Sequence, residues 1–174
     1  MHNVEIRQSR PDDLASIEKL YPAAFPEEDL LPLVRQLLAE EPGILSLVAE
    51  AGDAMAGHIL FTLCAITGSD ARAALLAPLG VAPELQRKGI GSALIREGLS
   101  RLERDGVTHV YVLGDPAYYG RSGFRTETGV APPYPLPEEH RDAWQSLGLG
   151  SAPPPVHGKL QLPDVWMQPA LWGP

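Results

Sequence analysis

The stretch that decides the fold is Leu79-Gly80-Val81-Ala82-Pro83-Glu84-Leu85-Gln86-Arg87-Lys88-Gly89-Ile90-Gly91-Ser92-Ala93-Leu94. It leads from an apolar strand through a polar turn into an amphipathic helix. The first N–H groups of a helix lack partners within the helix, and the helix dipole places about half a positive charge there. Gly89 and Gly91 carry no Cβ and leave the main chain open, while Arg87 and Lys88 add positive charge. The stretch therefore predicts a binding site for a phosphate-bearing anion.

Two common phosphate-binding motifs do not fit this turn. The pattern GxxxxGK[ST] of nucleoside triphosphatases is absent. The dinucleotide-binding pattern G-x-G-x-x-G fails at its third glycine, where the chain has Leu94. That pattern also belongs to the first strand–helix–strand unit of a domain, whereas this turn falls in the middle of the chain.

The residues before the turn show strand and helix periodicities. We expect a strand at 4–7, a helix opened by 11–13, a second helix opened by 26–28 and ended by 42–43, and strands at 45–50 and 55–66. The first helix presents Leu14, Ile17, Leu20 and Tyr21 on one face. Gly52 suits the positive φ of a hairpin turn between the two strands.

The turn itself lies inside a strand–helix–strand unit. We expect a strand at 73–81, a helix at 89–104 closed by Gly106, and a strand at 107–113. This spacing predicts a parallel strand pair with a right-handed crossover. Pro78 cannot donate a hydrogen bond within a sheet, so we expect a local bulge there. The predicted fold class is α/β with a mixed sheet.

The pattern is weaker after residue 113. Asp115-Pro116 predicts a short helix through capping by the aspartate and proline at the first helical position, and 143–149 predicts a last strand. Prolines 153–155 begin a proline-rich segment in which Trp166 and Trp172 favour packing against the protein. We therefore predict one folded domain at 1–150 and a proline-rich tail at 151–174 packed on it.

Composition narrows the functional classes. The 174 residues suit one domain, because domains commonly have about 100–150 residues. Residues 1–53 hold eleven acids and four bases, a net charge of −7, and the remaining 121 residues have a net charge of −1. This argues against nucleic acid as a partner. Acids near a cleft favour a cationic or amine-bearing partner, and they serve solubility equally well.

The chain carries no apolar run of about 18 residues that would span a membrane, and its first residues lack an apolar signal core. Cys64 is the single cysteine, so an internal disulfide is excluded and a reducing compartment is favoured. We expect a cytoplasmic protein, without a membrane or metal partner, that is a monomer or a homodimer.

The hexapeptide Gln86-Arg87-Lys88-Gly89-Ile90-Gly91 matches [QR]-x-x-G-x-[GA], the motif of GNAT acyltransferases. The chain resembles this superfamily also in Leu79-Gly80-Val81 and in Tyr119-Gly120-Arg121-Ser122-Gly123-Phe124, which is similar to the family's Y-x-x-x-G-F. The order of elements from Val4 to Phe124 is similar as well. Residues 114–121 resemble the bacterial YhbS-like subgroup, whose members are mostly predicted acetyltransferases.

The resemblance implies a fold, a reaction and a set of site residues. It implies a GNAT-type fold with two central parallel strands that splay apart, and transfer of an acetyl group from acetyl-coenzyme A (acetyl-CoA) to an amine that attacks directly. The cofactor-binding residues would be Leu79, Gly80, Val81, Gln86, Arg87, Lys88, Gly89, Ile90, Gly91, Ser92, Tyr118 and Arg121. A backbone N–H near Val81 would stabilise the oxyanion, and Tyr119 would protonate the departing thiolate.

Several roles stay open at the level of sequence. Tyr118 could exchange roles with Tyr119, because Asp115-Pro116 occupies a shortened loop where many family members carry an asparagine. For the general base, the candidates are Glu27, Glu28, His58 and His109, and none stands out. Cys64 lies in an apolar strand and is interpreted as a core residue. Two other hypotheses are a module of this fold that binds acyl-CoA without turnover and a transferase of longer acyl groups. The acceptor would be a small molecule or a protein amino group, recognised by loops at Tyr21–Pro32 and Gly129–Pro155.

Overall fold

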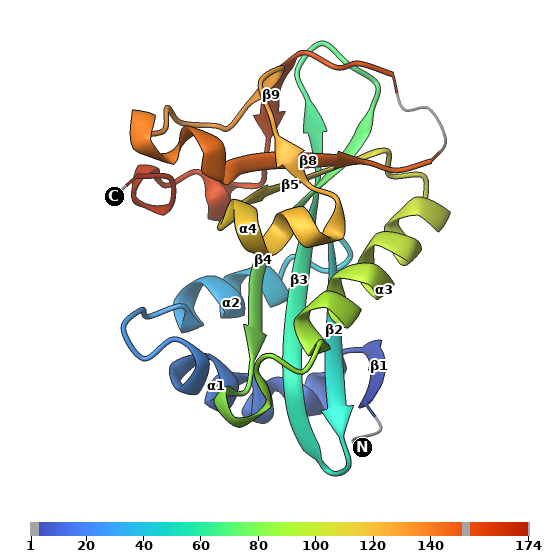
Figure 1. Cartoon of the computed structure of the whole chain (residues 1–174), viewed down its shortest axis with the longest axis vertical. Coiled ribbons are helices and arrows are strands. Elements are labelled where there is room, and N and C mark those ends of the chain that lie inside the picture. The colour runs from blue at the N-terminus through green and yellow to red at the C-terminus, as the bar shows by residue number, and fades with distance from the viewer. Residues whose placement is uncertain (1–3, 151–153, 174) are drawn as a thin grey trace. The chain divides into compact units, whose positions relative to one another are not determined.

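The computed structural model describes residues 4–150 and 154–173, which form two compact units. Unit 1 comprises Met1–Phe61 and Ala77–Gly98, and unit 2 comprises Thr62–Leu76 and Leu99–Pro174. Three elements have residues in both units: β3 (Ala54–Ile66), β4 (Arg72–Val81) and α3 (Ile90–Arg104). Figure 1 shows these elements with the remaining helices and strands.

Unit 1 contains the strand order β1-β2-β3-β4. β1 (Val4–Gln8) pairs antiparallel with β2 (Ile44–Ala51), and β2 joins β3 through a turn in which Gly52 has φ +65°. Two helices follow β1: α1 (Leu14–Ala24), preceded by the 3-10 turn η1 (Pro11–Asp13), and α2 (Leu31–Leu38). The hairpin and the first strand are confirmed.

The two helices correct the sequence prediction in detail. α1 buries Ile17, Leu20 and Tyr21, but Leu14, which we placed on the buried face, is 41% exposed. The second helix does not begin at Pro26. Residues 25–28 form a turn in which Glu28 N–H donates to Phe25 O (3.2 Å), and the helix begins at Leu31 with Pro32 in its first turn. Proline suits that position because it lacks an N–H that would stay unpaired there.

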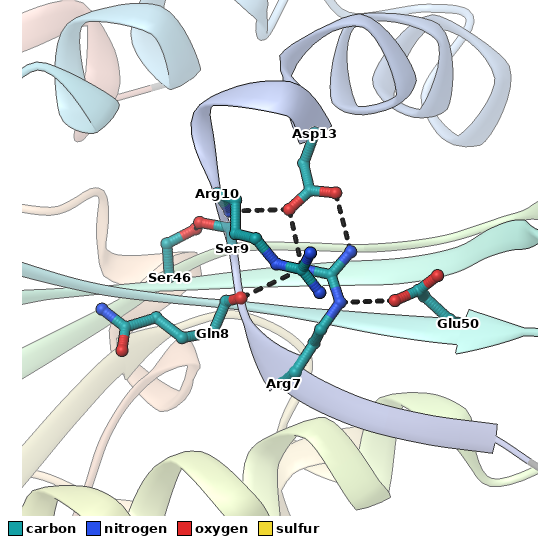
Figure 2. Close-up of polar contacts among 7 residues, drawn as sticks. All are labelled: Arg7, Gln8, Ser9, Arg10, Asp13, Ser46 and Glu50. Carbon is teal, nitrogen blue, oxygen red and sulfur yellow. Dashed lines mark hydrogen bonds and ion pairs between the residues drawn. The ribbon is translucent and has the colours of Figure 1, made fainter.

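An ion-pair cluster ties the start of unit 1 together (Figure 2). The Arg7 guanidinium donates from two nitrogens to the Asp13 carboxylate (2.8 and 2.9 Å) and from Nε to Glu50. Arg10 N–H donates to the same Asp13 carboxylate (2.6 Å). The hydrogen bond from Arg7 is the largest cause of a lowered pKa of Asp13. The cluster therefore ties β1, η1 and β2 together through partly buried charges.

Unit 2 is built around a parallel strand pair. β4 and β5 (His109–Leu113) are parallel with the register Ala73↔His109 to Leu75↔Tyr111, and β5 pairs antiparallel with β8 (Trp144–Gly148). The predicted parallel pair and the mixed α/β class are confirmed. The remaining elements are α4 (Pro116–Tyr119), β6 (Arg125–Thr126), β7 (Val130–Ala131) and the 3-10 turns η3 (Gly120–Ser122) and η4 (Glu138–Ala143).

Both faces of β5 are covered. Val110 and Val112 alternate in the sequence with His109 and Tyr111, but all four are buried, so neither side of the strand faces solvent. At Pro78 the structure has a cis peptide bond between Ala77 and Pro78. The helix at 89–104 is confirmed as α3, and Gly106, with φ +90°, follows its end as expected.

The strand at 143–149 is not the last one. β9 (Gly158–Gln161) pairs antiparallel with β3 and in parallel with β7, and two 3-10 turns follow it, η5 (Asp164–Trp166) and η6 (Pro169–Leu171). Trp166 and Trp172 are buried, and Trp166 Nε1–H donates to Thr62 Oγ1 (3.0 Å). The prolines at 153–155 lie partly outside the described residues. The domain boundary at residue 150 stays a prediction.

Among the described residues no helix has the length and apolarity needed to cross a membrane.

Gly98 in α3 is a packing constraint in unit 1. A Cβ on Gly98 would lie 2.2 Å from Phe61 Cε2, far inside contact distance. We therefore expect Gly98→Ala to lower the free energy of unfolding by about 1–3 kcal/mol, although alanine favours helix by about 1 kcal/mol. Urea unfolding of Gly98→Ala, Phe61→Leu and the double variant checks this. Phe61→Leu should recover part of the loss in the Gly98→Ala background, and additive losses would contradict the assigned clash.

Candidate functional site

The turn between β4 and α3 is held by hydrogen bonds within the turn and by one to β3. Ala82 N–H donates to Ala56 O (2.8 Å), and Leu85 N–H donates to Ala82 O (2.8 Å) through the 3-10 turn η2 (Pro83–Leu85). The Gln86 side-chain amide donates back to Val81 O (3.1 Å). The first residue of the motif thus fastens the turn to the end of β4.

Two residues of the turn have left-handed backbone. Arg87 has φ +64° and Gly89 has φ +85°. A left-handed conformation is costly for an arginine, by about 1 kcal/mol, and costs glycine little. A Cβ placed on Gly89 would meet no atom within 4 Å, so the main chain borders open space. The sequence explained this glycine by close approach alone, and the structure adds a conformational reason.

The start of α3 offers hydrogen-bond donors at the same place. Ala93 N–H donates to Gly89 O (3.0 Å), so the N–H groups of residues 90–92 come before the helical ladder. Residues 86–89 are exposed, Ser92 is half-buried, and Ile90 and Gly91 are buried. N–H groups without a partner in the helical ladder, a helix dipole and two exposed cations make this part of unit 1 suitable for a diphosphate.

The tyrosine motif belongs to unit 2 and is shaped by a glycine that the sequence analysis did not single out. Asp115 caps α4 by accepting from Ala117 N–H (2.9 Å). A Cβ on Gly114 would lie 2.5 Å from Tyr119 Cε2, so only glycine leaves room for this ring. Tyr119 also packs edge-on against Tyr118 (5.0 Å between ring centroids) and Phe124 (5.9 Å). Three neighbours therefore fix the Tyr119 ring.

The two tyrosines differ in burial. Burial is the main cause of a raised pKa at Tyr119, with smaller contributions from Tyr118 and Asp115. Burial also raises the pKa of Tyr118, while Arg121, whose guanidinium lies 4.9 Å from the Tyr118 ring centroid, lowers it. Both phenols stay protonated at neutral pH. Tyr119 is the more enclosed, and Tyr118 is covered by a cation.

The candidate bases lie in different settings. His58 is fully buried, hydrogen-bonded at both ring nitrogens, and its pKa is lowered to about 3 by burial. His109 is buried and bonded to Thr108 Oγ1 (2.8 Å) and Pro154 O (3.2 Å). Glu27 and Glu28 are exposed and line a pocket of about 300 Å³ formed by residues 22 and 25–31. Both histidines therefore have structural partners.

Cys64 does not have the setting of a nucleophile. Burial raises the pKa of its thiol to about 12, so the reactive thiolate is scarce at neutral pH. No cluster of three or more histidine, cysteine or acidic side chains that could hold a metal ion occurs within residues 4–150 and 154–173.

In chain order, a turn with two left-handed residues follows the first strand of a parallel pair and opens a long helix, and the tyrosine motif follows the second strand. This is the order of elements predicted for an acyltransferase-type α/β protein. Residues 14–124 match the Acetyltransferase (GNAT) family. The chain is 34% identical over 171 residues to YjhQ, an uncharacterized N-acetyltransferase of Escherichia coli strain K12, covering 94% of each protein. It is also 34% identical over 122 residues to YhbS of that strain, covering 68% of this chain and 72% of YhbS. The chain therefore belongs to the GNAT acetyltransferase family.

Solved structures agree with this assignment. The crystal structure of the E. coli GNAT family N-acetyltransferase YhbS in complex with CoA superposes with a TM-score of 0.86 at 27% identity, covering 97% of this chain and 94% of that one. A GNAT family acetyltransferase from Brucella melitensis in complex with acetyl-CoA has a TM-score of 0.75 at 32% identity, covering 95% and 99%. The predicted GNAT fold is confirmed.

Because His58 is buried, we expect it to make the free energy of unfolding depend on pH. Its pKa is about 3 in the folded chain and about 6.5 when unfolded, so below pH 6.5 the unfolded state binds an extra proton. The free energy of unfolding should therefore fall by about 2 kcal/mol between pH 7 and pH 5 on account of this residue. Urea unfolding of the wild type and His58→Gln at both pH values checks this. Parallel pH dependences in the two proteins would contradict it.

Proposed function

We propose that the chain transfers the acetyl group of acetyl-CoA to a primary amine by direct attack within a ternary complex. The observation that carries the proposal is the turn at 86–91, where left-handed Arg87 and Gly89 open the main chain ahead of α3. Its support is family membership and the CoA and acetyl-CoA complexes of two similar structures. Acetyl-CoA supplies the acyl group as a thioester.

The residues of the turn suit the diphosphate of this co-substrate. The N–H groups of residues 90–92 would donate to phosphate oxygens, Arg87 and Lys88 would add charge, and the open space at Gly89 would admit the anion. Leu79, Gly80 and Val81 of β4 are the proposed main-chain partners of the remaining arm. We assign to an N–H near Val81 the role of donor to the acyl oxygen, a contribution worth about 3–4 kcal/mol of barrier in other acyl-transfer sites.

Tyr119 is the proposed general acid, and Tyr118 and Arg121 are proposed to border the cofactor. The raised pKa of Tyr119 keeps its proton in place throughout the neutral range. As the pH rises toward 10, the ordinary pKa of a tyrosine, activity should therefore not fall through deprotonation of Tyr119. The pKa of Cys64, raised to about 12, argues against an acyl-enzyme on that thiol and favours direct attack by the amine.

Each predicted acceptor loop contributes to a pocket. In unit 1 the pocket at 22 and 25–31 carries Glu27, Glu28 and Asp29, which would attract a cationic amine. In unit 2 a pocket of about 380 Å³ is lined by residues 127–132, 136, 141 and 144, with Trp144 in its wall. We propose that the acceptor amine is selected by these loops, and that the acceptor is a small molecule or a protein amino group.

The turn can be tested without disturbing its conformation. Asparagine tolerates left-handed backbone, so Gly89→Asn should keep the fold and place a side chain in the open space. Gly52→Asn is the matched control, because Gly52 is also left-handed, with φ +65° and no atom within 4 Å of a built Cβ. Titration calorimetry should show CoA affinity reduced at least about tenfold in Gly89→Asn, since close main-chain approach is lost. Equal CoA affinities in both variants would overturn the diphosphate site proposed at residues 86–91.

The acid role predicts unequal effects at neighbouring tyrosines. Tyr119→Phe should lower thiol release from acetyl-CoA with a panel of primary amines about 10²-fold, with CoA affinity retained. Gly114→Ala should act in the same direction, because its Cβ would displace the Tyr119 ring. Tyr118→Phe should retain most of the rate.

If only Tyr118→Phe lowers the rate of thiol release, Tyr118 rather than Tyr119 is the general acid. Wild-type protein that binds acetyl-CoA but releases no thiol with any amine would favour the non-catalytic acyl-CoA-binding module.

A further inference from the structure

We propose that Tyr21, His58 and Ser46 are positioning residues that set the place of the β4 main chain at Gly80. This inference rests on the proposed function, because only that function assigns Gly80 and Val81 to the acyl end of the co-substrate. All the residues concerned belong to unit 1.

The three side chains form one buried hydrogen-bonded chain. The Tyr21 hydroxyl is 2.7 Å from His58 Nδ1, and His58 Nε2 is 2.8 Å from Ser46 Oγ. Tyr21, His58 and Ser46 are 1%, 0% and 2% exposed. The pKa of His58, lowered to about 3, keeps the ring neutral, and a neutral imidazole can accept at one nitrogen while donating from the other. Both ends of the ring are therefore held.

Ser9 anchors the far end of this chain. Its hydroxyl donates to Ser46 Oγ (2.6 Å) and its N–H donates to Ser46 O (2.9 Å), as Figure 2 shows for the two side chains. The hydrogen-bonded side chains thus connect four parts of unit 1. Tyr21 belongs to α1, His58 to β3, Ser46 to β2, and Ser9 follows β1. The Tyr21 hydroxyl is therefore tied to β3, to β2 and to the residue after β1.

The Tyr21 ring also lies close to β4 at Gly80. A Cβ on Gly80 would be 3.2 Å from Tyr21 Cε1 and 3.5 Å from Phe25 Cε2. Tyr21 and Phe25 stack, with ring centroids 6.2 Å apart and planes inclined by 14°. The two rings occupy the space that a side chain at position 80 would take. The β4 main chain therefore rests directly on rings whose place the hydrogen-bonded chain determines.

Stability alone does not explain the polar groups. A phenylalanine at 21 and an apolar residue at 58 would fill the same core, and a buried polar group costs about 1–3 kcal/mol when it is left unpaired. Fully satisfied polar networks fix one arrangement of their members, which apolar packing does less sharply. In this site the gain would be catalytic, because a displacement of about 1 Å at a reacting group can cost about 10²-fold in rate.

The test compares two measurements: the rate of thiol release, which depends on the acyl end of the co-substrate, and CoA affinity, which depends on its diphosphate end. Tyr21→Phe and Ser46→Ala should slow thiol release from acetyl-CoA with an amine panel by about tenfold, and calorimetry should show CoA affinity unchanged within about twofold. Thr62→Val is the control, because it also breaks a buried hydrogen bond, the one from Trp166 Nε1–H (3.0 Å), without touching this chain. Its rate per folded molecule should match the wild type.

Gly80→Ala keeps every hydrogen-bonding group and pushes the Tyr21 ring by a few tenths of an ångström. Gly80→Ala should reproduce the rate loss, because its Cβ acts on the Tyr21 ring while the main-chain groups of residue 80 are kept. Unchanged rates in Tyr21→Phe and Gly80→Ala, or equal losses of rate and CoA affinity in Tyr21→Phe and Ser46→Ala, would overturn the inference. A wild type that binds CoA and releases no thiol overturns instead the proposed activity, and one that binds no CoA overturns the proposed site.

Discussion

A left-handed residue at position 89 is the constraint on which the functional part of this fold depends. The chain must leave a buried strand at Val81 and enter a fifteen-residue helix at Ile90. The buried face of that helix fixes where its N-terminus lies, since Leu94 and Ile95 are fully enclosed. Closing the remaining gap takes two left-handed residues, and Arg87 accepts strain that Gly89 avoids. The N–H groups of residues 90–92 follow this turn and, as at any helix start, have no partner within the helix.

Elements whose signals are local could be predicted from the sequence. The β2–β3 hairpin follows from Gly52 between two apolar runs, and α3 follows from apolar spacing ended by Gly106. The start of α2 was predicted at the wrong proline, because Pro26 and Pro32 both suit a first helical turn. In the structure Glu28 N–H donates to Phe25 O in a turn, and the helix begins only at Leu31. β9 was missed for another reason. It is four residues long, follows a proline-rich segment, and forms only by pairing with β3 and β7, which are distant in the chain.

The same division holds for the candidate site. The motif at 86–91 and the tyrosine motif are each one continuous stretch of sequence. Each can therefore be recognised without knowing which distant residues meet in the fold. Gly114 and the Tyr21–His58–Ser46 chain depend on distances between separate elements, and no pattern in the sequence reports them. Gly80 shows the difference most clearly. The resemblance explains it by contact with a cofactor arm, while the structure shows a ring of α1 on its other side. A glycine at position 80 thus suits both the proposed cofactor arm and the Tyr21 ring, and the sequence indicates only the cofactor arm.

Burial of Tyr119 is compatible with its role as an acid because burial acts on both partners of a proton transfer. With ordinary pKa values of about 10 for the phenol and about 8.5 for a thiol, transfer to the thiolate is uphill by about 2 kcal/mol. Removing water raises the pKa of Tyr119 and makes the transfer harder if the thiolate stays solvated. A thiolate enclosed in the same surroundings is destabilised too, so its basicity rises with that of the phenolate. The difference between the two pKa values, rather than the value for Tyr119 alone, therefore decides whether the phenol can complete the reaction.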